Sequence, residues 1–201
     1  VIHRELGDPA PVPLLVHPAP RSVLGELAAA VYGHPSDRVV VLGVTGTSGK
    51  TTTTHMIRHL LMAQGKKVGL LGTIHTLLGD EVRSAANTTP DVIDLQRLLA
   101  EAVTRGITHV VMEVSSHAIS LERIAGCKFD VAVLTNITQD HLDFHKTFEA
   151  YVAAKKQLFT AIGPSDADKR YLVVNAADSS SAGIVKDCTA PVFSYSRSGA
   201  A

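Results

Sequence analysis

Apolar runs and amphipathic stretches alternate along the chain from Arg38 onward. The unbroken apolar run at 39–44 is typical of a strand buried on both faces of a parallel sheet. Further strands are predicted at 67–72, 108–114, 130–136, 171–174 and 191–195. Apolar positions at helical spacing predict helices ending at Gln64 and covering 91–105 and 147–160. Gly79-Asp80 predicts a hairpin turn between short strands at 74–78 and 81–84. The pattern therefore predicts an α/β fold of the P-loop type, with a mostly parallel sheet covered by helices on both faces.

The beginning of the chain follows a different pattern. Residues 1–20 are rich in proline and contain a short apolar piece at 14–16 that could form a strand. Ser22 can cap a helix that ends at 33–35. We therefore expect a domain boundary at 33–37, between a small unit at 1–32 and a main α/β domain at 38–201. Because the chain starts without a methionine, we expect it to be a fragment.

Composition excludes several classes of protein. The 201 residues carry a formal net charge of zero, which gives no electrostatic basis for binding nucleic acid or an anionic membrane. No apolar run reaches the roughly 18 residues of a membrane span. The two cysteines, Cys127 and Cys188, are typical of reduced thiols, and no signal peptide is visible. We expect a cytoplasmic, monomeric protein without membrane insertion.

The stretch GVTGTSGKTTTT, at 43–54, is close to a phosphate-binding loop. The usual spacing places a glycine six residues before Lys50, where this chain has Val44, with glycines at 43 and 46 instead. An ordinary turn rich in Gly, Ser and Thr is the alternative. The apolar strand before it and the helix after it favour the phosphate loop, because glycines and a helix N-terminus together expose amides to an anion. Lys50 could then reach the β- and γ-phosphates, and the Thr51 hydroxyl could ligate magnesium.

Two other strand ends carry polar side chains. Glu113 closes the apolar run at 108–114, and Asn136 to His145 follow the next strand. Ligands of open α/β sheets bind at the carboxyl ends of strands, so both segments are expected beside the phosphate loop, where oxygen ligands suit magnesium. For Asp140, Asp143 and His145 taken singly, a solvated polar loop is the better explanation. For Glu113 it is weaker, because burying an unpaired carboxylate is costly.

Lys155 falls on the apolar stripe of the predicted helix at 147–160, whereas Lys156 falls about 100° to the side. A lysine on a buried stripe can extend to solvent, pair with an acid, or lose its charge through a depressed pKa. The pattern alone favours extension to solvent. A neutral amine could instead add carbon dioxide and become a carbamate that ligates a cation.

Taken together, the motifs resemble those of the Mur ligases, the ATP-dependent amide-bond synthetases of bacterial peptidoglycan assembly. The matching segments are GTSGKTT at 46–52, NTTP at 87–90, MEVSSH at 112–117, TN and DHLD between 135 and 143, and AK at 154–155. The unusual glycine spacing of the loop is that family's own form. NTTP and EVSSH are similar to the members that add the third residue, usually meso-diaminopimelate or L-lysine, to UDP-N-acetylmuramoyl-L-alanyl-D-glutamate.

The resemblance implies ATP and Mg²⁺ as cofactors, with the UDP-N-acetylmuramoyl-dipeptide and a free diamino acid as partners. It implies Lys50 and Lys155 as catalytic residues, the latter carbamylated. The implied metal ligands are Thr51, Glu113, His141 and the modified Lys155. The implied ATP contacts are Gly46, Thr47, Ser48, Gly49, Lys50, Thr51, Thr52 and Asn136. The implied contacts to the muramoyl-peptide are Asn87, Thr88, Thr89, Ser115 and Arg123.

The family has three domains, so the resemblance makes 1–32 the end of the UDP-binding domain and 38–201 a truncated ATP-binding domain. The amino-acid-binding domain would be absent, and we expect the chain alone not to complete a ligation. Alternatives are another ligase of the superfamily, such as a folylpolyglutamate synthase, or a P-loop module without ligase activity. No Asp-x-x-Gly or Asn-Lys-x-Asp motif occurs, which counts against a GTPase.

Overall fold

The computed structural model describes residues 15–163 and 170–197, and its centre is an eight-stranded sheet in the order β4-β3-β2-β5-β1-β6-β7-β8. In this spatial order, each neighbouring pair from β2 through β5, β1, β6 and β7 to β8 is parallel. The strand β3 pairs antiparallel with both β2 and β4. The strands are β1 (Val40–Thr45), β2 (Val68–Leu71), β3 (His75–Leu78), β4 (Glu81–Ser84), β5 (His109–Glu113), β6 (Val131–Leu134), β7 (Tyr171–Asn175) and β8 (Val192–Tyr195). The strands predicted from residue 38 onward and the hairpin are therefore confirmed.

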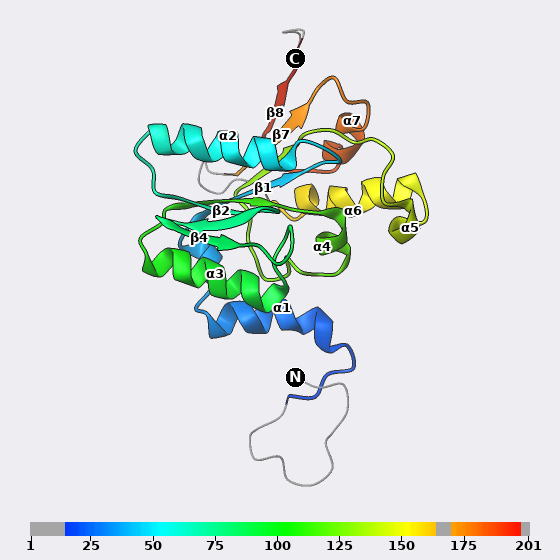
Figure 1. Cartoon of the computed structure of the whole chain (residues 1–201). Coiled ribbons are helices and arrows are strands. Elements are labelled where there is room, and N and C mark those ends of the chain that lie inside the picture. The colour runs from blue at the N-terminus through cyan, green and yellow to red at the C-terminus, as the bar shows by residue number, and fades with distance from the viewer. Residues whose placement is uncertain (1–14, 164–169, 198–201) are drawn as a thin grey trace.

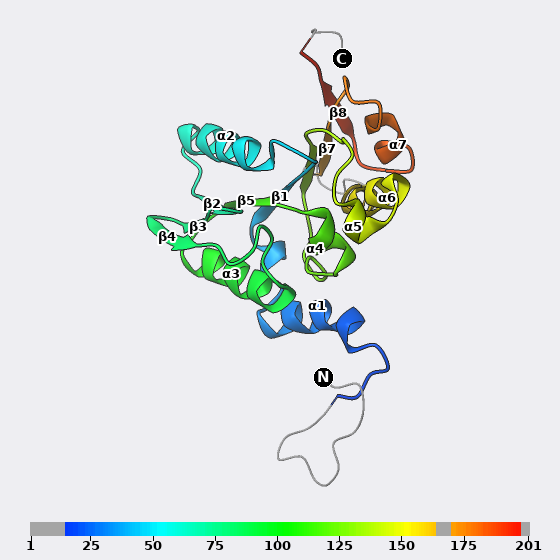
Figure 2. The ribbon, with the colours of Figure 1, turned by 45° about the vertical axis from the view of Figure 1, so that its right-hand side comes forward.

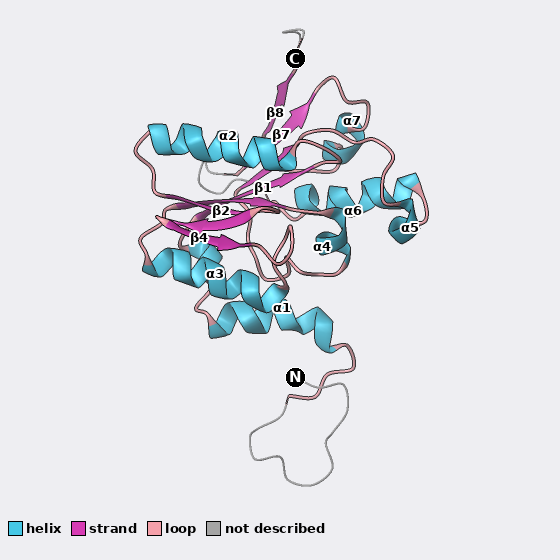
Figure 3. Cartoon of the chain, viewed as in Figure 1, coloured by secondary structure: helices cyan, strands magenta, loops and turns pink. Residues whose placement is uncertain are grey.

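Helices cover both faces of this sheet, as Figures 1 and 2 show. The helix α2 covers one face, and α3, α4, α6 and α7 lie on the other, with α1 packed outside α3. The helical elements are α1 (Pro20–Val31), η1 (Pro35–Asp37), α2 (Lys50–Ala63), α3 (Val92–Thr104), α4 (Ser116–Ser120), α5 (Leu142–His145), α6 (Phe148–Thr160) and α7 (Ser181–Val185). This confirms the predicted fold class, and Figure 3 shows the alternation of helix and strand.

The hydrophobic core is divided by the sheet. Val44, Val68, Val111 and Val133 point toward α2 and pack against Ile57 and Leu61 of that helix. The larger cluster on the opposite face joins the other side of the strands to α3 and α6. The central strands β1 and β5 therefore have apolar side chains on both faces, which explains their unbroken apolar sequences.

Capping residues fix where the two long helices on the larger cluster begin. The Asp91 side chain accepts a hydrogen bond from the Val92 N–H at the start of α3. The Thr147 hydroxyl accepts one from the Ala150 N–H at the start of α6. Both predicted helices thus start one residue later than the sequence suggested, because the predicted first residue is the cap. No helix within the described ranges is long and apolar enough to cross a membrane.

The expectations for the first part of the chain need correction. The first helix begins at Pro20, and Ser22 lies in its first turn, where its hydroxyl donates to the Ala19 carbonyl. Val16 makes only an isolated bridge, so 15–16 do not form a strand, and the rest of the predicted piece lies outside the described residues. The helix α1 packs closely on the loop before β6, since a Cβ on Gly25 would lie 2.4 Å from the Ala125 Cβ.

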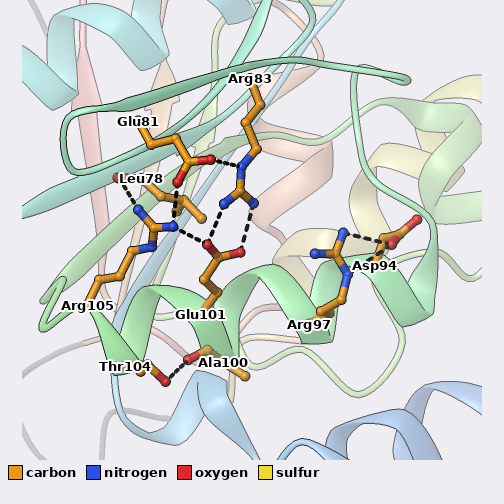
Figure 4. Close-up of polar contacts among 9 residues, drawn as sticks. All are labelled: Leu78, Glu81, Arg83, Asp94, Arg97, Ala100, Glu101, Thr104 and Arg105. Atoms are coloured by element: carbon orange, nitrogen blue, oxygen red, sulfur yellow. Dashed lines mark hydrogen bonds and ion pairs between the residues drawn. The ribbon is translucent and has the colours of Figure 1, made fainter.

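A cluster of four charged side chains fastens the β3–β4 hairpin to α3 (Figure 4). Arg83 of β4 pairs with Glu81 and with Glu101 of α3, and Arg105 pairs with the same two carboxylates. Arg105 also donates to the Leu78 carbonyl. Hydrogen bonds from the guanidinium groups lower the pKa of Glu81 to about 2 and lower that of Glu101. The hairpin at the edge of the sheet is thereby linked to α3.

Substituting Arg83 with methionine should accelerate amide hydrogen exchange in β4 by severalfold while leaving β1 unchanged. The reason is that the variant loses the links to Glu81 and Glu101 but keeps the apolar stem. Exchange measured by mass spectrometry at low and high salt checks this, and the difference should shrink at high salt. Arg97→Met is the matched control, because Arg97 pairs with Asp94 of the same helix. Equal acceleration in both variants would contradict the role of the cluster.

Candidate nucleotide-binding site

The parallel register brings three strand ends together at one edge of the sheet. Val44 of β1 stands beside Glu113 of β5, and Thr45 stands beside Leu134 of β6. The phosphate-loop residues 46–49 leave β1 at this point and enter α2 at Lys50. The polar segments after β5 and β6 therefore flank the loop, as the sequence predicted.

The phosphate loop crosses tightly over the end of β6. Gly46 has φ of +148°, and a Cβ at this position would lie 1.9 Å from the Thr135 hydroxyl. The Asn136 Oδ1 accepts from the Ser48 N–H at 3.1 Å, and its Nδ2 donates to the Ser48 carbonyl at 3.0 Å. Thr135 donates to the Ser48 carbonyl at 2.7 Å. The loop conformation therefore depends on the residues after β6 as much as on its own glycines.

Lys50 lies at the start of α2 and points back over the loop. Its Nζ donates to the carbonyls of Gly46 and Thr47, both at 2.9 Å. Burial lowers the pKa of Lys50, and the nearby carboxylates of Glu113 and Asp140 oppose this shift. The first turn of α2 adds N–H groups that have no partner within the helix. A lysine cation and these amides form the concave, positive surface that an anion needs.

Glu113 is 1 % exposed and accepts hydrogen bonds at both carboxylate oxygens. The Thr51 hydroxyl lies 3.0 and 2.9 Å from Oε1 and Oε2. Thr73, in the loop after β2, donates its N–H at 2.8 Å and its hydroxyl at 3.1 Å. A side chain on Gly72 would collide with this carboxylate, because its Cβ would lie 2.6 Å from Oε1. The loop after β2 therefore packs directly on the predicted metal ligand.

A cleft of about 590 Å³ joins most of the predicted site residues. At one end it is lined by the phosphate loop and at the other by the loops before α3 and after β5. The predicted residues that line it are Thr47, Ser48, Gly49, Lys50, Thr51, Asn87, Thr88, Thr89, Glu113, Ser115, Arg123 and His141. Gly46, Thr52, Asn136 and Lys155 do not line it. Gly46 is buried at the start of the loop, Asn136 bonds the backbone of Ser48, and Thr52 is exposed on α2.

Hydrogen bonds connect the predicted substrate contacts to one another. The buried Thr89 donates to the Glu113 carbonyl at 2.9 Å and accepts from the Ser115 N–H at 3.1 Å. The Arg123 guanidinium lies 3.5 Å from the Thr89 carbonyl. Thr88 lies within 3.1 Å of the Thr73 hydroxyl. The segment 87–89 is thus fixed against the end of β5, next to the Glu113 carboxylate.

Lys155 is 1 % exposed, and its Nζ donates to the Gly46 carbonyl at 3.0 Å. The interpretation in which its charge extends to solvent is therefore wrong. Burial lowers the pKa of Lys155 to about 7, and the positive charge of Lys50 acts in the same direction. Lys156 is partly exposed and pairs with Asp187, as expected for the neighbour on the side of the stripe.

Histidines gather next to the cleft. His141 has a left-handed φ of 53° and its ring meets His117 edge-on at 4.7 Å. His145 is buried and its Nε2 lies 2.9 Å from the Ser116 hydroxyl, so the expectation of a solvated loop is wrong for this residue. Asp143 is exposed and Asp140 is partly so, which agrees with a polar loop. Burial lowers the pKa of both His117 and His145.

The donors around Glu113 suit magnesium, because they are carboxylate and hydroxyl oxygens. Within the described ranges, no three His, Cys, Asp or Glu side chains are grouped so as to enclose a metal ion by themselves. A magnesium ion here would take its remaining ligands from hydroxyls, water and phosphate, which is its usual habit in nucleotide sites. The residues present therefore fit that ion.

Sequence reasoning gave no role to Thr73, His117 and Leu121, which also line the cleft. Thr73 carried a usable signal, since it directly follows the predicted strand at 67–72, much as Glu113 directly follows the apolar residues at 110–112. His117 was part of a matched motif without a role of its own. Nothing in the sequence distinguishes Leu121, which comes to the cleft through the turn after α4.

The family model of the Mur ligase middle domain matches residues 44–201. The chain belongs to the Mur ligase family. A Mur ligase of known structure, the UDP-N-acetylmuramoyl-L-alanyl-D-glutamate--2,6-diaminopimelate ligase, superposes with a TM-score of 0.75 and 28 % identity. The superposition covers 90 % of this chain and 37 % of that protein.

Curated Mur ligases are similar to this chain at higher identity. A protein of Geobacter metallireducens is 46 % identical over 177 residues, 87 % of this chain and 35 % of its own length. One of Corynebacterium glutamicum is 48 % identical over 171 residues, 85 % of this chain and 33 % of its own length. Both are named UDP-N-acetylmuramoyl-L-alanyl-D-glutamate--2,6-diaminopimelate ligase. The chain thus spans about a third of the length of these relatives.

The Lys155→Met variant of this Mur ligase chain should gain stability over the wild type at pH 6, and the gain should shrink as pH rises. Because the pKa of Lys155 is about 7 when folded and about 10.4 when unfolded, the unfolded chain binds more protons between these values. Wild-type stability therefore rises relative to the variant by about 1.4 kcal/mol per pH unit above pH 7.

Urea unfolding of both proteins from pH 6 to pH 9.5 measures this difference, and effects shared by the two proteins cancel. Lys156→Met is the control, and its difference from the wild type should not follow this slope. A pH-independent difference for Lys155→Met would mean that the buried lysine stays charged throughout.

Proposed function

We propose that the chain is the central, nucleotide-binding part of an ATP-dependent ligase of peptidoglycan precursor synthesis. The ligase would add the third amino acid to UDP-N-acetylmuramoyl-L-alanyl-D-glutamate in the cytoplasm. The names of the two relatives give 2,6-diaminopimelate as that amino acid, and we propose the same one here. Residues 38–201 would belong to the ATP-binding domain and 1–32 to the end of the UDP-binding domain.

The observation that carries this proposal is the single cleft shared by the phosphate loop and the segment 87–89. A ligase that activates a carboxylate must hold the γ-phosphate and that carboxylate next to each other. Lys50 stands at the phosphate end, and Ser115 and Arg123 stand with Thr88 and Thr89 at the other. The guanidinium of Arg123 suits a carboxylate or phosphate of the muramoyl-peptide.

The proposed reaction has two steps. The terminal carboxylate of the dipeptide attacks the γ-phosphorus of ATP, the bond to the β-phosphate oxygen breaks, and ADP leaves an acyl phosphate behind. The amine of the third amino acid then attacks the acyl carbon, releases phosphate and a proton, and forms the amide. Lys50 would neutralise charge on the transferred phosphoryl group, and the amides of the first turn of α2 would orient it. The work of this chain is therefore positioning and electrostatic stabilisation.

Magnesium would be held by Glu113, Thr51 and His141, and a carbamate on Lys155 would hold a second ion. When bound, the ions neutralise negative charge on the phosphates. The lowered pKa of Lys155 supports the modification, because a neutral amine is the form that adds carbon dioxide. The burial of Glu113 against Thr51 and Thr73 supports a preformed carboxylate ligand.

The purified chain should bind a non-hydrolysable ATP analogue with magnesium, and Lys50→Ala should weaken this binding by about tenfold or more, because a charge-assisted hydrogen bond to phosphate is lost. Calorimetric titration checks this. Lys66→Ala, at an exposed lysine after α2, is the control and should bind like the wild type. A folded wild type that does not bind the nucleotide, or equal affinity in the wild type and Lys50→Ala, would refute the proposed loop function.

In the full-length enzyme, Lys155→Ala should abolish phosphate transfer from ATP while Lys156→Ala should not. Lys155 touches the loop through the Gly46 carbonyl, whereas Lys156 pairs with Asp187 away from it. Phosphate release in the presence of all substrates measures this. Equal losses in the two variants would contradict the assignment of Lys155.

A further inference from the structure

The phosphate loop is anchored at Thr47 by a set of hydrogen bonds from outside the loop. The Thr47 hydroxyl lies 2.9 Å from the Tyr151 hydroxyl, 3.0 Å from the Thr138 carbonyl oxygen and 2.9 Å from the Thr138 nitrogen. The Thr47 N–H donates to the Asn136 carbonyl at 2.8 Å. A single loop residue thus meets both the segment after β6 and the helix α6.

Counting protons fixes the direction of these bonds. A threonine hydroxyl has one proton and two lone pairs. The Thr138 carbonyl can only accept, so it receives the Thr47 proton, and the Thr138 N–H occupies one lone pair. The remaining lone pair can only accept, so Tyr151 is the donor to Thr47. The Thr47 hydroxyl is then saturated and has no proton left for a phosphate.

Tyr151 is suited to this task by its surroundings. The side chain is fully buried, so its hydroxyl needs a hydrogen-bond partner inside the protein, and Thr47 provides it. The ring also lies under Lys155, whose Nζ is 4.5 Å from the ring centroid. That Nζ in turn donates to the Gly46 carbonyl. One aromatic side chain therefore contacts the loop through its hydroxyl and the buried lysine through its ring.

We propose that Tyr151 is a positioning residue for nucleotide binding. Its hydroxyl holds the phosphate loop at Thr47, and its ring holds the Lys155 amine against the Gly46 carbonyl. Thr47 is then an anchor of the loop and not a phosphate ligand. The inference rests on the proposed function, since it assumes that the loop binds a nucleotide. A loop already held in its anion-binding shape loses less conformational freedom on binding, which raises affinity.

Tyr151→Phe tests the hydroxyl, because it keeps the ring beside Lys155. We expect it to weaken binding of the magnesium complex of a non-hydrolysable ATP analogue by about two- to tenfold, the effect of one hydrogen bond. In the Thr47→Val background the same substitution should cause no further loss, because its partner is already gone. Tyr32→Phe, at the end of α1, is the matched control and should bind like the wild type.

Amide hydrogen exchange without nucleotide separates positioning from a general loss of stability. Tyr151→Phe should accelerate exchange at 46–48 while β1 and β5 keep wild-type protection. Uniform acceleration, wild-type affinity in Tyr151→Phe, or additive losses in the double variant would each overturn the inference alone. A wild-type chain that binds no nucleotide would refute the proposed function, and the inference would fall with it.

Discussion

The shape of the phosphate loop depends on the segment that follows β6. The Asn136 side chain bonds both the N–H and the carbonyl of Ser48, and the Thr135 hydroxyl donates to that Ser48 carbonyl as well. That segment is itself held by the far half of the sheet, since Asn175 donates to the Thr135 carbonyl and Asp178 accepts from the Ile137 N–H. The conformation of the loop at 46–49 therefore depends on residues more than eighty positions later in the sequence. The segments after β6 and β7 are needed to hold the loop in place.

Two buried ionisable side chains, Glu113 and Lys155, lie next to this loop, and their hydrogen-bond partners differ. The Glu113 carboxylate meets donors at both oxygens, from Thr51 and Thr73. The amine of Lys155 has the Gly46 carbonyl and the face of Tyr151. Several donors offset the cost of burying a carboxylate, whereas one neutral acceptor offsets little of the cost of burying an ammonium. Burial therefore leaves the Glu113 carboxylate with a donor at each oxygen and lowers the pKa of the Lys155 amine.

The strands, the long helices and the loop could be predicted from the sequence, because each depends on a local period or a local turn. Glu113 was found because a carboxylate after an apolar run is unusual. Lys155 was placed on the buried stripe correctly, but the pattern could not show that the Gly46 carbonyl lies 3.0 Å away. The short helix α4, the burial of His145 and the contact of Thr73 with Glu113 depend on tertiary packing between distant segments, which no local pattern encodes.

Lys50 and Lys155 share one acceptor, the Gly46 carbonyl, which each approaches from its own helix. A neutral carbonyl is a poor substitute for a charged acceptor, because a buried ammonium is stabilised most by a negatively charged partner. An anion bound in the loop would give the Lys50 Nζ a charged acceptor in place of the two carbonyl groups to which that Nζ now donates. Moving Lys50 toward the anion would leave the Gly46 carbonyl to Lys155 alone. The geometry around Gly46 thus links the two lysines through a single backbone atom. The backbone can follow this path only because position 46 has no side chain, since a Cβ there would lie 1.9 Å from the Thr135 hydroxyl.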